Sequence, residues 1–309
     1  MLMRLAGWFL LLLVVSAIAF ALPQLTGVDP VRAVIMARSP DAAPSEETVA
    51  RLGAALGVHD PLPVRYLRFL RDLVSGDLGL SYTSRMPVAL ALWRATAISS
   101  LVIGAALLVG VVVGMSAGVL AAVRPRRLAD RVIGRASRLG IAVPEFILAN
   151  LLVVVFAIRL HWVRASGWGR PADAILPIVT LAVAPAAMIA QLTRAELRGV
   201  LDEPWVRAAR AKGMPERRIV RQSLRSSAGS VTALLSLFFP GLLGGTVVIE
   251  EIFAIPGLGQ LLLHSVLASD LPVAQAGLVM VMLLAMVLSL TADGVRLLID
   301  PRLRVEVRT

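Results

Sequence analysis

The stretch Ala97–Val123 reads AISSLVIGAALLVGVVVGMSAGVLAAV and contains no charged residue. About 20 consecutive apolar residues cross the hydrocarbon core of a bilayer as a helix, so this stretch predicts a transmembrane span. Four further stretches of similar character are also free of charge, and a sixth carries a single charge, Glu145. These five stretches are Leu5–Val28, Leu139–Ile158, Ala174–Thr193, Ser226–Ile249 and Leu271–Ala292. We therefore expect an all-α polytopic membrane protein with six transmembrane helices.

The composition supports this fold class. The chain has 309 residues, of which 58% are hydrophobic, and its mean hydropathy is +0.82. Six spans use roughly 120 residues, which leaves room for loops and not for a large soluble domain. With 24 glycines and 18 prolines the chain is neither collagen-like nor of low complexity. The absence of cysteine excludes a disulfide scaffold and thiolate chemistry, and the three histidines, His59, His161 and His264, fit no metal-ligand spacing.

The basic residues predict the orientation. Twenty of the 31 lysines and arginines lie in segments that are cytoplasmic if both termini are inside, whereas the short outside loops hold three. The other eight lie in the segment Gln24–Thr96, which is too long for its charge to dictate orientation. We expect both termini inside. Leu5–Val28 also resembles a signal peptide ending at Ala19-Phe20-Ala21, but we expect a retained helix.

The expected organisation has four parts along the chain. Residues 1–28 form the first transmembrane helix, 29–96 an outside loop with amphipathic helices, 97–300 the remaining transmembrane domain, and 301–309 a cytoplasmic tail. In the outside loop the helix period predicts short helices at Thr48–Leu56 and Pro63–Val74. A seventh apolar stretch, Ile252–Ser269, is broken by proline and glycine, so we expect a re-entrant or interfacial turn followed by a short helix.

A basic cytoplasmic segment lies between the fourth and fifth spans. It reads LDEPWVRAARAKGMPERRIVRQSLRSS from Leu201 to Ser227. Asp202 is expected to cap a short helix that has Pro204 in its first turn and that ends at Gly213; a second helix starts at Pro215. Arginines on these helices can pair with carboxylates of a partner protein. The alternative is a basic loop that binds anionic lipid headgroups.

This segment resembles the EAA loop of bacterial ABC-importer permeases, in which a small-residue motif precedes a glycine. VRAARAKGMPERR is similar to the dipeptide, oligopeptide and nickel permease family, and so is GGTVVIEEIFAIPGLGQ from Gly244 to Gln260. The resemblance assigns the loop 201–227 as a coupling helix that docks on an ATPase. Its coupling residues are Arg207, Ala208, Ala209, Arg210, Lys212, Gly213 and Glu216.

The resemblance implies a permease subunit of an ATP-driven importer in the bacterial inner membrane, which is not itself an enzyme. No Walker-type loop occurs in the chain, so ATP and Mg²⁺ are expected on a separate ATPase and no cofactor on this chain. The implied partners are a second homologous permease, two ATPase subunits or domains, an extracytoplasmic solute-binding protein and the lipid bilayer, with no nucleic acid.

The solute implied most directly is a di- or oligopeptide, with nickel or a metal chelate as the alternative. An ion-coupled secondary transporter is the more distant alternative. Such a transporter would be expected to carry several acids or histidines inside the membrane, whereas five of the six stretches carry none.

Polar residues in the spans are candidates for the translocation path. Glu145 follows Arg138 by seven residues, roughly 10 Å at 1.5 Å per residue, and is a candidate to attract a cationic solute or a peptide amino terminus. The alternative is a carboxylate near the inner membrane interface that snorkels to water or pairs with Arg138 or Arg194. Asn150 and Gln191 are further candidates, with interhelical hydrogen bonds as the alternative. The candidates to dock the binding protein are Glu250, Glu251, Pro256, Gly257 and Gly259; the alternative for Glu250 and Glu251 is that they only mark the membrane interface.

Overall fold

The computed structural model describes residues 2–26, 31, 35, 46–55 and 60–299. Within these ranges the chain is helical, and its β structure is limited to one isolated bridge between Leu80 and Pro87. The predicted tail at 301–309 lies outside the described residues, as do His59 and the last two residues of the first predicted segment. The all-α class is confirmed.

The chain divides into two compact units, each assembled from separate parts of the sequence. The first unit comprises Met1–Ser99 and Pro256–Met286, and the second comprises Ser100–Ile255 and Val287–Thr309. The helices of the first unit are α1 (Leu2–Thr26), α3 (Glu46–Ala55), α4 (Leu62–Ser75) and α11 (Leu258–Leu267). Two helices, α5 (Val88–Val123) and α12 (Leu271–Ile299), continue from one unit into the other.

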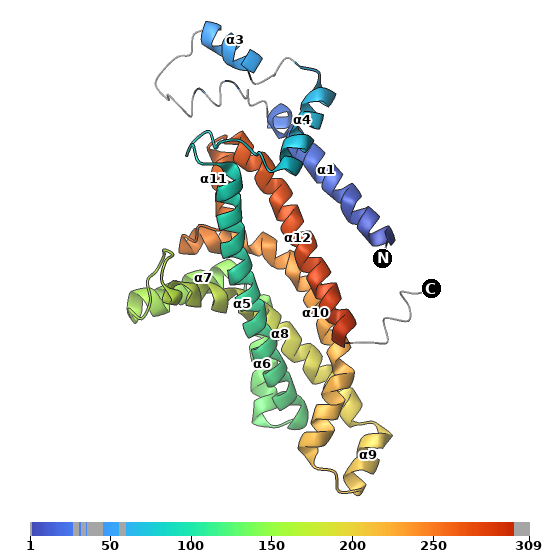
Figure 1. Ribbon diagram of the computed structural model, residues 1–309. Helices are drawn as coiled ribbons and strands as arrows, with labels where there is room; N and C mark the ends of the chain where they lie inside the picture. Colours follow the sequence, from blue (N-terminus) through green and yellow to red (C-terminus); the bar gives the residue numbers. More distant parts are fainter. Residues whose placement is uncertain (1, 27–30, 32–34, 36–45, 56–59, 300–309) are drawn as a thin grey trace. The chain divides into compact units, whose positions relative to one another are not determined.

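The second unit holds the remaining helices, with α8 at its centre. α8 packs against both α6 and α10, and Figure 1 shows these helices alongside one another. The helices are α6 (Leu128–Ala142), α7 (Glu145–Leu152), the π-helical η1 (Val153–Arg159), the 3₁₀ turn η2 (Pro171–Ala174), α8 (Ile175–Leu201), α9 (Pro204–Ala211) and α10 (Glu216–Phe253).

Several of these helices are able to cross a bilayer. Three of them are long and apolar enough on their own, namely Val88–Val123, Pro171–Leu201 and Leu271–Thr291. Two pairs of helices joined at a sharp bend raise the number to five if each pair is one span; they are Leu128–Ala142 with Glu145–Arg159 and Gly241–Phe253 with Leu258–Leu267. The apolar helix Gly7–Ala21 in α1 is shorter than a full span. The described part of the chain is therefore an all-helical membrane protein with three to five candidate spans.

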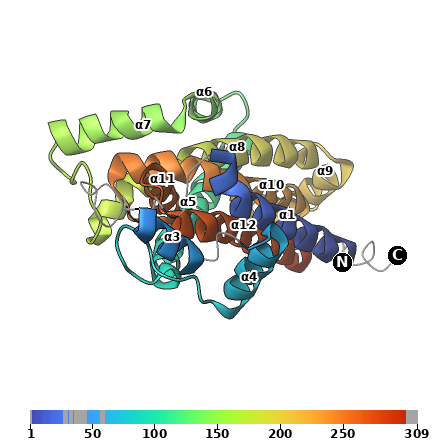
Figure 2. The ribbon, with the colours of Figure 1, turned by 90° about the horizontal axis from the view of Figure 1, so that it is seen from above.

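The predicted span Leu139–Ile158 is wrong as one continuous helix. α6 ends at Ala142 and α7 begins at Glu145, and the two axes differ by 106°. Pro144 explains the break, because proline has no N–H to donate and its ring disfavours the helical conformation of the preceding residue. Val143 accordingly has φ −82° and ψ 121°. Figure 2 shows the corner, with α6 seen end-on and α7 lying across the view.

The predicted break after the fifth apolar stretch is confirmed. α10 ends at Phe253, Ala254 adopts a left-handed conformation with φ 50°, and the short helix α11 begins at Leu258. In the first unit, Ser99 supports the start of α11, since its hydroxyl accepts a hydrogen bond of 2.8 Å from the Leu258 N–H.

A row of glycines lets α5 approach α8 closely within the second unit. A Cβ added at Gly114 would lie 2.6 Å from the Ala186 carbonyl oxygen, and one added at Gly118 would lie 2.7 Å from the Thr193 Cβ. Small residues four apart allow helix backbones to meet in this way in membranes, where burial of apolar surface alone does not drive association. The spacing is visible in the sequence, and the sequence analysis did not use it.

The amphipathic helix predicted at Pro63–Val74 is confirmed as α4, and it packs on α1. The Tyr66 hydroxyl lies 2.8 Å from the Ser16 hydroxyl, and the Tyr66 and Phe69 rings lie 5.4 Å and 6.0 Å from the Phe20 ring. The other face of α4 carries exposed Arg68, which donates to Asp60 at 2.8 Å. This helix therefore covers α1 with its aromatic side.

Candidate functional site

Helix α9 and the turn after it form a short exposed structure between α8 and α10. Gly213 follows α9 with φ +79°, and its N–H donates to the Arg210 carbonyl at 2.9 Å. The Met214 N–H donates to the Ala209 carbonyl at 3.0 Å. These two bonds form the Schellman arrangement, which satisfies the last carbonyls of a helix and favours glycine at the left-handed residue. The predicted helix end at Gly213 is confirmed.

The predicted cap at the start of α9 is wrong by one residue. The N-cap is Glu203, and Asp202 still belongs to the end of α8, where its N–H donates to the Arg198 carbonyl at 3.2 Å. Glu203 makes no capping bond with its side chain; its carboxylate accepts a 2.7 Å bond from the Trp205 indole. Pro204 stands at the first position of the helix, as predicted.

A small apolar cluster fixes α9 against the first turn of α10. Val206, Ala209 and Ile219 are buried there, with Leu201, Trp205 and Met214 packed around them. Ala209 was expected to face a partner together with Ala208, but it is 8% exposed and belongs to this cluster. The turn is therefore a folded element with a defined inner and outer side.

The outer side of α9 is basic. Four residues of this side are exposed: Arg207, Ala208, Lys212 and Gly213. Neither Arg207 nor Lys212 has a hydrogen-bond or ion-pair partner within the described ranges. Arg210 differs, because its guanidinium donates to the Glu216 carboxylate at 2.6 Å and so joins α9 to α10. This hydrogen bond raises the pKa of Arg210 above its ordinary value. Arg210 and Glu216 thus brace the turn, and Arg207 and Lys212 remain available to a partner.

A buried carboxylate at the start of α6 connects three helices of the second unit. Asp130 accepts 2.6 Å bonds from both Arg194 and Arg198 of α8 and a 2.9 Å bond from the Arg126 backbone N–H. Arg198 also donates to the Ala121 carbonyl of α5 at 3.3 Å. The Asp130 side chain is 6% exposed. This cluster was not predicted from the sequence, because the two arginines are 64 and 68 residues away from Asp130 in the chain.

The cluster around Asp130 lies outside the apolar stretches. The hydrogen bond from Arg194, with those from the Arg126 N–H and Arg198, holds the pKa of the Asp130 carboxyl well below its usual range, although burial acts in the opposite direction. Asp130 is therefore a charged structural acid. Arg198 is three residues before the end of α8, so the cluster fixes the helix that leads directly into α9.

Glu145, at the first position of α7, has a different environment. Its side chain is half-buried and lies against α10, where a Cβ added at Gly245 would be 2.6 Å from Oε2. The proposed partner Arg194 is occupied by Asp130, and Arg138 makes no ion pair with Glu145. Among the described residues Glu145 has no hydrogen-bond or ion-pair partner. The ion-pair alternative for Glu145 is therefore wrong within the described part of this chain.

The other two candidates for the translocation path are both exposed. The Asn150 amide donates to the Phe146 carbonyl one turn earlier in the same helix at 2.8 Å, so the interhelical bond considered as its alternative is not made. Gln191 has no hydrogen-bond partner in the described ranges and is exposed on α8. Neither side chain is brought together with Glu145 by a contact in the described structure, and their place in a path stays a prediction.

The residues predicted to dock a binding protein differ in exposure. In the second unit Glu250 is 1% exposed and Glu251 is exposed. In the first unit Pro256 is exposed, whereas Gly257 and Gly259 are buried at the start of α11. Glu251 and Pro256 are thus the exposed members of this set, and a role of the five residues in docking stays a prediction.

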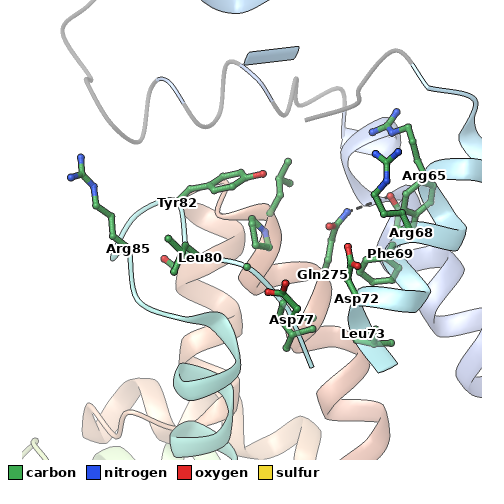
Figure 3. A pocket seen from close by; sticks show the side chains of 17 residues that line it. Arg65, Arg68, Phe69, Asp72, Leu73, Asp77, Leu80, Tyr82, Arg85 and Gln275 are labelled. Carbon is green, nitrogen blue, oxygen red and sulfur yellow. Dashed lines mark hydrogen bonds between the residues drawn. The ribbon is translucent and has the colours of Figure 1, made fainter. Parts of the chain in front are cut away.

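The first unit contains a pocket that the sequence analysis did not anticipate. It has a volume of about 820 Å³ and lies between α4, the loop before α5 and the start of α12 (Figure 3). Arginine, aspartate and aromatic side chains line it, among them Arg65, Asp77 and Tyr82, together with Gln275. The Gln275 amide donates to the Phe20 carbonyl at 3.4 Å. The pocket depends on residues from four separate segments, which explains why no local pattern indicated it.

Asp270 holds one wall of this pocket in place. The carboxylate is buried at 1% exposure and accepts hydrogen bonds from the Ser81 and Thr83 hydroxyls at 2.5 and 2.8 Å and from the Tyr82 backbone N–H at 3.1 Å. These bonds tie the loop before α5 to the start of α12. In the described ranges no group of three or more metal-ligating side chains occurs, here or elsewhere.

Apolar helices long enough to span a bilayer, together with a short basic helix held at the surface by its own small core, define a helical membrane protein. The chain matches two family models. Residues 110–305 match the binding-protein-dependent transport system inner membrane component, and residues 1–90 match the N-terminal region of such membrane components. The chain belongs to this family of transport permeases, which are subunits of bacterial ABC importers and are not enzymes.

Individual relatives agree with the family. The chain is 35% identical over 302 residues to the glutathione transport system permease protein GsiC of Escherichia coli O6:H1 (strain CFT073), with 97% of each chain covered. It is 34% identical to GsiC of Escherichia coli K12 over the same share of each chain. The fold resembles a chain of the inward-facing MetNI methionine ABC transporter, with a TM-score of 0.57, 21% identity, and coverage of 69% of this chain and 98% of that chain. The protein is therefore a multi-pass protein of the bacterial inner membrane.

Proposed function

We propose that this chain is the permease subunit of an ATP-driven peptide importer and that α9 is its coupling helix. The observation that carries the proposal is the basic outer side of α9, a short helix fixed by its own apolar cluster and closed by Gly213. Arg207 and Lys212 are exposed and unpaired within the described residues, so they are suited to carboxylates in a groove on an ATPase.

The proposed topology has six spans with both termini in the cytoplasm. Positive charge supports it, because 20 of the 31 basic residues then lie in cytoplasmic segments. In this topology the six spans are the three unbroken helices, α1 and the two broken helix pairs. The loop with α9 faces the cytoplasm, and α4 with the adjacent pocket faces the outside.

The working transporter contains further subunits in this proposal. Two ATPase subunits or domains bind ATP and Mg²⁺ and move α9, a second homologous permease completes the path, and a binding protein delivers solute at the outside face. Glu251 and Pro256 are the exposed candidates for that delivery surface. The cluster around Asp130 transmits the movement of α9, because it joins the end of α8 to α5 and α6.

The proposed solute is a short peptide. The relatives named above are permeases of a glutathione transport system, and glutathione is peptide-like. A peptide importer also agrees with the resemblance of the coupling loop and of the stretch Gly244–Gln260 to dipeptide and oligopeptide permeases.

Affinity purification of the tagged chain from detergent-solubilised native membranes tests the coupling assignment. We expect an ATPase and a second permease to be recovered with the wild type, and the double variant Arg207→Glu, Lys212→Glu to lose the ATPase while it keeps the second permease. Arg135→Glu is the matched control, since Arg135 is also exposed and unpaired among the described residues and lies on α6. Equal recovery of the ATPase with the double variant and with the control would contradict the assignment of α9.

A further inference from the structure

Glu145 occupies an unusual position for an ionisable side chain. It is the sole charge in the apolar stretch Leu139–Ile158. The helix break at Pro144 places it at the start of α7, and its carboxylate lies against the backbone of α10 at Gly245. A charge inside a membrane is costly unless it is paired or faces water, and such residues mark ion and solute pathways.

No residue that the structure describes pairs with this carboxylate. Arg194, the basic residue nearest in sequence on α8, donates its hydrogen bond to Asp130, and no cation of the described residues reaches Glu145. Asn150, one and a half turns further along, is bonded to its own helix. The N-terminus of α7 stabilises a negative charge there, but it supplies only a partial positive charge. The remaining compensation must come from outside the described residues.

The face of α10 beside Glu145 has room for a ligand. The Glu145 carboxylate occupies the space that a side chain at Gly245 would need. Cβ atoms added at Gly241 and Gly244 would meet no described atom within 4 Å. Three glycines within five residues leave these three positions of α10 without side chains, whereas Leu242 and Leu243 between them are buried. A small group that carries a positive charge can therefore approach Oε1 and Oε2 without displacing a side chain of these glycine positions.

We propose that Glu145 binds the ammonium group of the transported solute inside the membrane and so selects solutes with a free amino group. This inference rests on the proposed function and adds the chemical class of the solute. An ammonium group offers three donors to a carboxylate, and the match is one of charge as well as of hydrogen bonding. For a short peptide the group is the amino terminus.

The test compares two probes that differ in this charge. Uptake of radiolabelled alanyl-alanine and of N-acetyl-alanyl-alanine is measured at concentrations well below saturation, where a weaker binding site lowers the rate, in cells in which the intact transporter is the sole route for both. We expect the variant Glu145→Gln to reduce uptake of alanyl-alanine about tenfold, the usual order for loss of a charged hydrogen-bond partner. Uptake of the acetylated probe by the same variant should stay within about twofold of the wild type, because that probe never used the charge.

Two further variants separate selectivity from damage to the fold. Glu145→Asp keeps the charge and should retain most of the preference for the free amine. Ser116→Ala is the matched control, because the Ser116 hydroxyl bonds only the Val112 carbonyl of its own helix, at 2.7 Å. It should transport both probes as the wild type does. Recovery of each variant with its partner subunits is measured in parallel.

The outcomes distinguish this inference from the proposed function. If the wild type takes up alanyl-alanine and Glu145→Gln takes it up equally well, the ammonium site is wrong and the importer assignment stands. If Glu145→Gln reduces both probes to the same extent, or loses its partner subunits, Glu145 pairs with a partner chain and the inference is also wrong. If the wild type takes up no alanyl-alanine, the peptide proposal fails and the ammonium site fails with it.

Discussion

Asp130 and Glu145 are two acids fifteen residues apart in the chain, and their surroundings are opposite. Asp130, at the start of α6, accepts bonds from two arginines of α8 and from a backbone N–H. Glu145, at the start of α7, has no partner among the described residues and lies against a glycine of α10. A paired buried acid maintains the fold, whereas an unpaired acid in an apolar stretch keeps its capacity for a ligand. The two roles are therefore distinguished by whether the carboxylate has hydrogen-bond partners, and not by burial alone.

The largest effect expected from this comparison is the loss of Asp130. In the variant Asp130→Asn two guanidinium groups lose their carboxylate, and breaking a buried pair on one side costs about 3 kcal/mol. We expect the free energy of unfolding in mixed detergent micelles to fall by this amount. Glu145→Gln, measured in the same way, should leave stability unchanged or slightly raised, because it removes no bond. A loss of stability with Glu145→Gln as large as with Asp130→Asn would refute the contrast.

Gly245→Ala sharpens the comparison without substituting either acid. The new Cβ would be 2.6 Å from Oε2 of Glu145, so the carboxylate must move. We expect uptake of alanyl-alanine to fall about threefold, since a displaced charged partner loses part of its hydrogen-bond energy. Gly244→Ala is the control, because its Cβ meets no described atom within 4 Å. Equal uptake by the two alanine variants would show that the position of Glu145 against α10 is unimportant.

The ion pair between Arg210 and Glu216 should contribute less to stability than the bonds of Asp130. Both side chains are about half exposed, and pairs of this kind contribute roughly 0.5 kcal/mol. We expect Arg210→Ala to increase hydrogen exchange of the amides in the turn 211–214 by about twofold and to leave the ATPase bound. Loss of the ATPase from this variant would mean that Arg210 contacts the partner directly, as the sequence analysis had assumed.

The smallest effect is expected from pH. The native pKa of the Asp130 carboxyl lies below the value of about 4 for an unfolded aspartate, so its contribution to stability is complete above that value and is lost as the pH falls below it. The difference in unfolding free energy between wild type and Asp130→Asn should therefore be constant from pH 5 to pH 8. A difference that shrinks between pH 7 and pH 5 would show that Asp130 is not the strongly paired acid described here.

The comparison also shows which features the sequence could predict. The end of α9 at Gly213 and the amphipathic helix α4 follow from local signals, and both are confirmed. The partners of Asp130 are more than sixty residues away, so no local pattern reveals them, and Arg194 was considered only as one of two possible partners of Glu145. The break at Pro144 was visible in the sequence, but the length of the apolar stretch was given more weight than the missing backbone donor.

The spacing of small residues is a second signal that was available. Gly110, Gly114 and Gly118 recur every four residues in the stretch that predicts the second span. Such a repeat indicates close packing of two helices in a membrane, and α8 is the helix it contacts. The pocket of the first unit had no such signal, because four segments distant in sequence form it.

The energy source of transport tests the central claim most directly. Right-side-out membrane vesicles that contain the complete transporter and its binding protein are loaded with ATP, and uptake of labelled alanyl-alanine is measured with and without an uncoupler. We expect uptake to require internal ATP, to persist when the ion gradients are dissipated, and to be abolished by Arg207→Glu, Lys212→Glu. Uptake that stops with the uncoupler and continues without ATP would contradict the importer assignment and would favour an ion-coupled transporter.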